Sequence, residues 1–280
     1  MTTRLLPAAA ALAALVSCAP PPSVLRIATT TSVDNSGLLE AIVPHFERES
    51  GVDVQAIAVG SGRAFQIARR GDASLLLTHE PIGERALFDD GLVRYYRKVM
   101  FNRFVIAGPA ANPAGVRASE SASDAMTRIV RSGALFVSRG DESGTHAREK
   151  SLWAAAGARP RPAHLIETGQ GMSATLRVAS SRQGYVLTDE ATLARLAGAV
   201  TLVAIYTGDP ALLNTYAVAI LTTARPARNE AADRFAQWLA EGAGQAHIDA
   251  FRISGRPVFF RWPDGVDRTA PESTPAGVPR

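Results

Sequence analysis

The sequence is poor in cysteine, in aromatic residues and in dense runs of one charge. Cys18 is the single cysteine among 280 residues, so no disulfide can form within the chain and the fold must rely on its apolar core. Aromatic residues make up 6%, and the 30 lysines and arginines are scattered, so nucleic-acid binding has little support. The formal net charge of +4 would help to attract a small anion, and it suits an ordinary solvated surface equally well.

The common signs of catalysis and of metal binding are missing as well. No Gly-x-Ser-x-Gly elbow occurs, which a serine hydrolase of the α/β type would need. The five histidines include no pair at the His-x-x-x-His spacing of a metal site. A Ser/His hydrolase built on Ser143 and His146 remains an alternative, although no carboxylate with an orienting role accompanies the pair. The sequence therefore predicts a protein that is not an enzyme and that has neither a metal site nor a cofactor.

The clearest targeting signal lies at the start of the chain. Leu5–Val16 is an apolar run broken by one proline, and it is shorter than the ~20 residues that span a bilayer, which is typical of a secretory signal peptide. The run ends in Leu15-Val16-Ser17-Cys18, which resembles a bacterial lipobox. We therefore expect residues 1–17 to be removed and Cys18 to be lipidated, which would hold the protein on the extracytoplasmic face of the membrane. Ordinary cleavage near Ala19 is the alternative.

Short apolar strands alternate with helices along most of the chain. Val24–Ala28 and Val52–Val59 have the pattern of strands, and the helical spacing of apolar residues in Gly37–Glu49 predicts a helix between them. Such alternation is typical of a parallel sheet covered by helices. Val99–Ala107 then leads into a second α/β unit, from which Thr201–Ile205 returns. We therefore predict an α/β fold of two lobes, each a mainly parallel sheet flanked by helices, with a ligand cleft between them.

The predicted lobes have explicit boundaries. The first lobe is discontinuous and comprises residues 24–107 and 201–262, and the second comprises residues 108–200. Residues 263–280 are rich in Pro, Gly, Asp and Thr, which predicts a flexible tail.

Three polar clusters follow predicted strands, which is where ligands bind in open α/β sheets. They are Thr29-Thr30-Thr31-Ser32, Gly60-Ser61-Gly62 and Ser138-Arg139-Gly140-Asp141-Glu142-Ser143-Gly144-Thr145-His146. Each alone could be a helix cap or a turn, but four hydroxyl residues in a row exceed what a cap needs. Hydroxyls and the free amides at a helix start together favour an anion. The clusters therefore predict an anion site.

Arg139 is the strongest single candidate for an anion ligand. Its guanidinium group can present two parallel donors to two oxygens of one anion. A site made of donors suits an anion without a proton, such as tungstate, molybdate or sulfate at neutral pH. A protonated phosphate would require an acceptor, and the nearby Asp141 and Glu142 leave phosphate open.

These segments together resemble the tungstate-binding subfamily of periplasmic solute-binding proteins, over about Leu25 to Pro257. Further matching motifs are Asp34-Asn35-Ser36-Gly37-Leu38-Leu39, Gly71-Asp72-Ala73 and Gly169-Gln170-Gly171-Met172. One departure is the stretch Thr78-His79-Glu80-Pro81, where the family reads toward valine–histidine–alanine; His79 is retained, and we expect a structural role for it.

The resemblance implies a type II periplasmic-binding-protein fold that holds a tetrahedral oxyanion in its cleft. It implies tungstate or molybdate as the ligand, with phosphate or sulfate as the alternative within the same fold. It also implies a monomer that delivers the ion to the permease and ATPase subunits of an ABC importer. The residues implied to bind the ion are Thr30, Thr31, Ser32, Ser61, Arg139, Ser143, Gly144 and Thr145.

Overall fold

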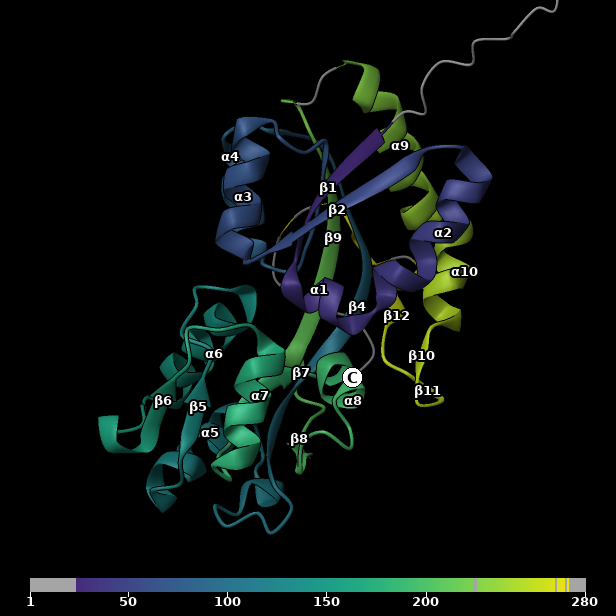
Figure 1. Ribbon diagram of the computed structural model, residues 1–280. Coiled ribbons are helices and arrows are strands. Elements are labelled where there is room, and N and C mark those ends of the chain that lie inside the picture. Colours follow the sequence, from purple (N-terminus) through teal and green to yellow (C-terminus); the bar gives the residue numbers. More distant parts are fainter. Residues whose placement is uncertain (1–23, 224–225, 265, 270, 272–280) are drawn as a thin grey trace, which may run out of the picture.

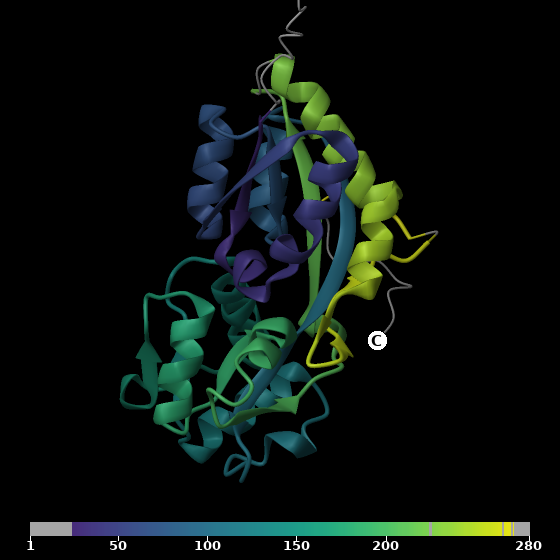
Figure 2. The same ribbon diagram turned by 45° about the vertical axis from the view of Figure 1, so that its right-hand side comes forward.

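The computed structural model describes residues 24–223, 226–264, 266–269 and 271 (Figure 1). The expected signal peptide and Cys18 lie outside these residues, as does most of the expected tail. Across the described part of the chain, no helix is both long and apolar enough to cross a membrane. The described elements form two lobes that two long strands connect (Figures 1 and 2).

The first lobe contains a mixed sheet in the order β12-β4-β9-β3-β1-β2. Its strands are β1 (Val24–Thr30), β2 (Asp53–Val59), β3 (Leu75–Thr78), β4 (Val93–Pro109), β9 (Leu213–Leu221) and β12 (Phe260–Arg261). β1 pairs in parallel with β2 and β3, whereas β9 runs antiparallel to β3 and β4. The carboxyl ends of β1, β2 and β3 therefore meet at one edge of the sheet.

Helices cover both faces of this sheet (Figure 1). They are α2 (Leu38–Ser50), α9 (Pro226–Glu241) and α10 (Ala243–Ala250) on one face, and α3 (Ser61–Arg70) and α4 (Pro81–Asp89) on the other. In β3, Leu75 and Leu77 belong to the core under α2 and α9, while Leu76 belongs to the core under α3 and α4. Because a strand alternates its side chains between two faces, a strand that is covered on both sides needs consecutive apolar residues.

The second lobe uses the C-terminal half of β4, where Phe104–Pro109 pairs antiparallel with β7 and β8. Its own strands are β5 (Phe136–Ser138), β6 (Leu165–Glu167), β7 (Val186–Asp189) and β8 (Leu202–Tyr206). Its helices are α5 (Ala122–Ser132), α6 (Gly144–Ala156), α7 (Met172–Ser181) and α8 (Glu190–Arg195). The remaining short elements are α1 (Thr31–Ser36), η1 (Val116–Ala118), η2 (Pro162–His164), η3 (Pro210–Leu212), β10 (Arg252–Ile253) and β11 (Arg256–Pro257).

The two-lobed α/β architecture agrees with the prediction, and three details differ from it. The sheets are mixed rather than mainly parallel, because β4 and β9 run against their neighbours. The predicted return strand near residue 201 is β8, which pairs with β4 inside the second lobe; the chain re-enters the first sheet at β9. Part of the expected tail is held, since the backbone N–H of Lys98 donates to the carbonyl of Arg268 at 2.8 Å.

Candidate functional site

Three of the four hydroxyl side chains at the end of β1 have different hydrogen-bond partners. Thr29 donates to the Leu77 carbonyl at 2.9 Å and so joins β1 to β3. Thr30 caps α1 by accepting the Val33 N–H at 3.3 Å, which is the role of an ordinary N-cap. Ser32 is buried and faces the other lobe, where its hydroxyl accepts from Arg139. Capping therefore explains one hydroxyl of the run, and Ser32 belongs to the cleft.

The second cluster places Ser61 at the first turn of α3. Gly60 is the N-cap of this helix and offers no side chain to its free amides. Ser61 is 2% exposed, and its hydroxyl accepts the backbone N–H of Gly144 at 3.2 Å. Because Ser61 belongs to the first lobe and Gly144 to the second, this hydrogen bond shows that the cleft is closed.

Arg139 lies on the loop between β5 and α6 and is 2% exposed. Its Nη1 donates to the hydroxyl of Ser32 at 3.3 Å, and its Nη2 donates to Asp141. Its Nε is buried and has no hydrogen-bond partner among the residues that the structure describes. The next residue, Gly140, has a φ of +59°, and a Cβ there would lie 3.0 Å from that of Glu167, so this turn requires glycine.

The start of α6 completes the second lobe's side of the cleft. Ser143 is the N-cap, accepts the His146 N–H at 3.3 Å and donates its own N–H to Asp141 at 3.2 Å. Thr145 is fully buried, and its hydroxyl lacks any partner within the described part of the chain. A buried donor without a partner is costly, and such groups call for an explanation such as an absent ligand. Two such groups, Arg139 Nε and Thr145 Oγ1, lie within residues 139–145, the segment that also contacts Ser32 and Ser61.

A fourth helix start reaches the cleft, and the site prediction had omitted it. α7 begins after Gly171, which also lacks a capping side chain. A Cβ on Gly171 would lie 4.0 Å from the hydroxyl of Thr31, so the two lobes also meet here. The Gly169-Gln170-Gly171-Met172 motif was the available signal. The starts of α3 and α7, which have no capping side chain, give the closed cleft a positive field without adding a titratable group.

Buried acids surround the cationic centre from the side of the second lobe. Glu149 accepts from the Ser138 hydroxyl at 2.9 Å and from the Trp153 indole at 3.3 Å. Burial raises the pKa of Glu149 to about 7. Asp189 caps α8 by accepting the Thr192 N–H at 2.8 Å, and burial raises its pKa despite the nearby charge of Arg139. Both oxygens of each carboxyl group accept hydrogen bonds from residues of the second lobe.

His79 lies at the edge of the site and is held by the crossing strands. Its Nδ1 is 2.9 Å from Asn214 Oδ1 on β9, and its ring is 5% exposed. Asn214 donates its amide group to Asn102 Oδ1 on β4 at 2.7 Å, so its oxygen faces His79 and the imidazole Nδ1 carries the proton. Burial, with the charges of Arg139 and Arg148, lowers the pKa of His79 to about 4. His79 is therefore a neutral residue at the junction of both lobes.

Comparison with known proteins places this geometry in context. The family model of the PBP superfamily domain matches residues 17–242. The tungstate-binding protein TupA of Peptoclostridium acidaminophilum is 33% identical over 245 residues, which cover 83% of this chain and 84% of that protein. The solved structure of the tungstate-binding protein TupA from Desulfovibrio alaskensis G20 has a TM-score of 0.76 and 37% identity, covering 85% of this chain and 98% of that one. The crystal structure titled the tungstate ABC transporter from Geobacter sulfurreducens has the same TM-score and 35% identity, covering 81% and 98% of the respective chains.

Proposed function

The chain belongs to the tungstate-binding proteins of the PBP superfamily, and we propose that it is the extracytoplasmic substrate-binding component of an ABC importer, with tungstate as its ligand. The observation that carries the proposal is the pair of buried donors, Arg139 Nε and Thr145 Oγ1, which have no acceptor among the described residues. An oxyanion in the cleft would supply acceptors to both and offset the cost of burying them.

The carboxylates near the site support a ligand without a proton. Asp141 accepts from Arg139 with one oxygen and from the Ser143 N–H with the other, so both of its oxygens are already engaged. Glu142 is exposed and lies 2.8 Å from the ammonium group of Lys150. Asp141 could accept the proton of hydrogen phosphate only as a further bond to an oxygen that is already engaged, whereas tungstate, molybdate and sulfate need no acceptor.

We propose that the ion is held by donors from both lobes. Thr30, Thr31, Ser32 and Ser61 would contribute from the first lobe, and Arg139, Ser143, Gly144 and Thr145 from the second. The contacts of Ser32 with Arg139 and of Ser61 with Gly144 bring these two groups together. Closure would therefore complete the donor set and remove water from it, which strengthens each charge-assisted hydrogen bond.

We propose that Ser143 binds the ion and that Ser143 and His146 do not form a catalytic pair. The ring Nδ1 of His146 accepts the Glu142 N–H at 3.1 Å, and the hydrogen bond between His146 and Ser143 uses the backbone N–H of His146. The imidazole is thus not placed to take a proton from the serine hydroxyl through Nδ1. The proposed binding function needs no cofactor.

The proposed setting follows from the start of the sequence. Lipidation of Cys18 would anchor the protein at the membrane surface, close to the permease and ATPase subunits that we propose as its partners. We also propose that it acts as a monomer. A second acyl chain would make the anchor stable, because a single chain binds a bilayer only marginally.

Calorimetric titration of the mature protein, stripped of ligand, with tungstate, molybdate, sulfate and phosphate tests the proposed function. Submicromolar tungstate binding with much weaker phosphate binding is expected. Arg139→Ala should lower the tungstate affinity at least tenfold, because a charge-assisted donor set is lost, while the exposed Arg177→Ala provides a charge-matched control. Tight phosphate binding with weak tungstate binding would contradict the proposed ligand.

A further inference from the structure

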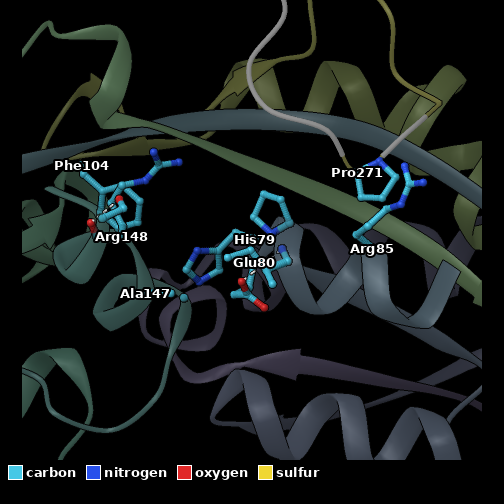
Figure 3. A pocket seen from close by; sticks show the side chains of 11 residues that line it. His79, Glu80, Arg85, Phe104, Ala147, Arg148 and Pro271 are labelled. Atoms are coloured by element: carbon cyan, nitrogen blue, oxygen red, sulfur yellow. Dashed lines mark hydrogen bonds between the residues drawn. The ribbon is translucent and has the colours of Figure 1, made fainter. Parts of the chain in front are cut away.

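A cavity of about 430 Å³ lies between the lobes beside the start of α6 (Figure 3). Its lining residues are His79, Glu80, Pro81, Ile82, Arg85, Phe104, Gly144, Ala147, Arg148, Ser151 and Pro271. None of Thr30, Ser32 and Arg139 lines it. Gly144 is the one proposed oxyanion residue among the lining residues, and a Cβ on it would lie 3.3 Å from His79 Cε1. The cavity therefore adjoins the proposed oxyanion site at Gly144 and is otherwise lined by different residues.

The walls of this cavity are mainly apolar. Phe104 of the crossing strand β4, Pro81, Ala147 and Pro271 contribute hydrocarbon surface. Ile82 at the rim is 77% exposed, which makes it the most exposed large apolar side chain in the described part of the chain. A concave, mostly apolar space with a few polar groups is the usual form of a small-molecule site, and its volume falls within the range of such sites.

Arg148 supplies an uncompensated positive charge to the cavity. It is partly buried, which lowers its pKa, and its hydrogen bond to the Leu213 carbonyl is long at 3.4 Å. No carboxylate of the described residues lies within ion-pair distance of it. The one lining acid, Glu80, is engaged as the N-cap of α4, where it accepts the Gly83 N–H at 2.7 Å. A partly desolvated cation of this kind favours an anionic partner.

His79 supplies a neutral acceptor beside that cation. Its Nδ1 proton is directed at Asn214, which leaves the lone pair on Nε2 to accept a hydrogen bond. The imidazole remains uncharged at neutral pH because burial and the neighbouring arginines lower its pKa to about 4. The cavity therefore combines two cations, one neutral acceptor and apolar walls; Arg85 is paired with Asp89, whereas Arg148 has no carboxylate partner among the described residues.

We propose that this cavity is a second ligand site, which binds a small monoanionic carboxylate with an apolar body and a hydroxyl group. The carboxylate pairs with Arg148, the hydroxyl donates to His79 and the body packs against Phe104 and the prolines. Because the walls come from both lobes, the cavity forms when the cleft is closed. Occupation of the cavity and of the oxyanion site then favour each other by the same factor.

Titration of the full mature protein with 4-hydroxybenzoate, in the presence and absence of saturating tungstate, tests this proposal. We expect saturable binding with a Kd below about 1 mM, tightened severalfold by tungstate. Benzoate should bind more weakly, and the neutral 4-hydroxybenzyl alcohol should bind at least tenfold more weakly. Absence of binding to both forms of the protein, or equal binding of acid and alcohol, would overturn the proposal.

Two variants assign the binding to this cavity. Arg148→Ala should weaken 4-hydroxybenzoate binding at least tenfold. It should leave the tungstate affinity in the absence of the acid unchanged, because the Arg148 side chain donates to the Leu213 carbonyl and to none of the proposed oxyanion residues. The control is Arg177→Ala. Ala147→Leu, which fills the cavity, should abolish binding of the acid. Unchanged acid binding in both variants would place the acid elsewhere. Binding that appears only after removal of residues 272–280 would mean that the chain's own end occupies the cavity, and it would also overturn the proposal.

Discussion

Replacement of Thr145 by valine should have opposite effects on the free and the liganded protein. The side chain is fully buried and its hydroxyl has no partner in the described part of the chain. Valine has the same shape and removes only the hydroxyl. If tungstate accepts from that hydroxyl, the variant loses a hydrogen bond to a charged group, which is worth about 1.5–3 kcal/mol. The tungstate affinity should therefore fall about 10- to 150-fold.

The free protein should not suffer from the same change. An unsatisfied buried hydroxyl costs about 1–3 kcal/mol, so its removal should leave the melting temperature unchanged or raise it by several degrees. The matched control is Thr127→Val on α5, because the Thr127 hydroxyl already donates to the Ser123 carbonyl at 2.9 Å. Differential scanning calorimetry and isothermal titration give the two readings. Unchanged tungstate affinity in Thr145→Val would refute the assignment of this hydroxyl to the ion.

Three further changes probe closure, buried charge and anchoring. Gly144→Ala places a Cβ 3.3 Å from the carbonyl oxygen and the ring of His79, so the lobes should close less well. The tungstate affinity should fall about 3- to 10-fold, and X-ray scattering should give a larger radius of gyration for the loaded protein. Glu149 has a pKa raised from 4.5 to about 7, so between these pH values the folded protein holds a proton that the unfolded chain has lost, and its contribution to stability declines as pH rises through this window. Glu149→Gln should remove this pH dependence of the free energy of unfolding, measured in urea, which amounts to up to about 3 kcal/mol. An unchanged pH dependence would contradict the raised pKa. Cys18→Ala should release the protein from membrane fractions, whereas retained acylation would contradict the lipid anchor.

The sequence predicted that the three polar clusters lie near one another because each follows an apolar strand. Ser32, Ser61 and Arg139 each come within two residues of a strand's end, and ligands bind at that edge of an open α/β sheet. Their role in binding the ion stays a prediction. The sequence could not say which hydroxyl of the run has which role. Thr29 and Thr30 are used within the first lobe, whereas Ser32 crosses to Arg139, and this division depends on how the strand is rotated.

The parts that sequence reasoning missed depend on contacts between distant segments. β4 begins at Val93, earlier than the apolar run indicates, because its first residues pair with β9, while Arg94 forms an ion pair with Asp233 of α9. β8 has the pattern of any short apolar strand, and nothing local tells which lobe's sheet it joins. His79 is kept neutral by burial at the lobe junction, and its ring is oriented by Asn214, a residue 135 positions away.

A crystal structure of the tungstate-loaded mature protein, with anomalous data at a tungsten absorption edge, would locate the ion relative to the two buried donors. We expect one strong tungsten peak within about 5 Å of Ser32 Oγ, Thr145 Oγ1 and Arg139 Nε, a distance set by one W–O bond and one hydrogen bond. The hydroxyl of Thr145 and the Nε of Arg139 should each contact a tungstate oxygen. A tungsten peak elsewhere, with these two donors still lacking an acceptor, would contradict the proposed site.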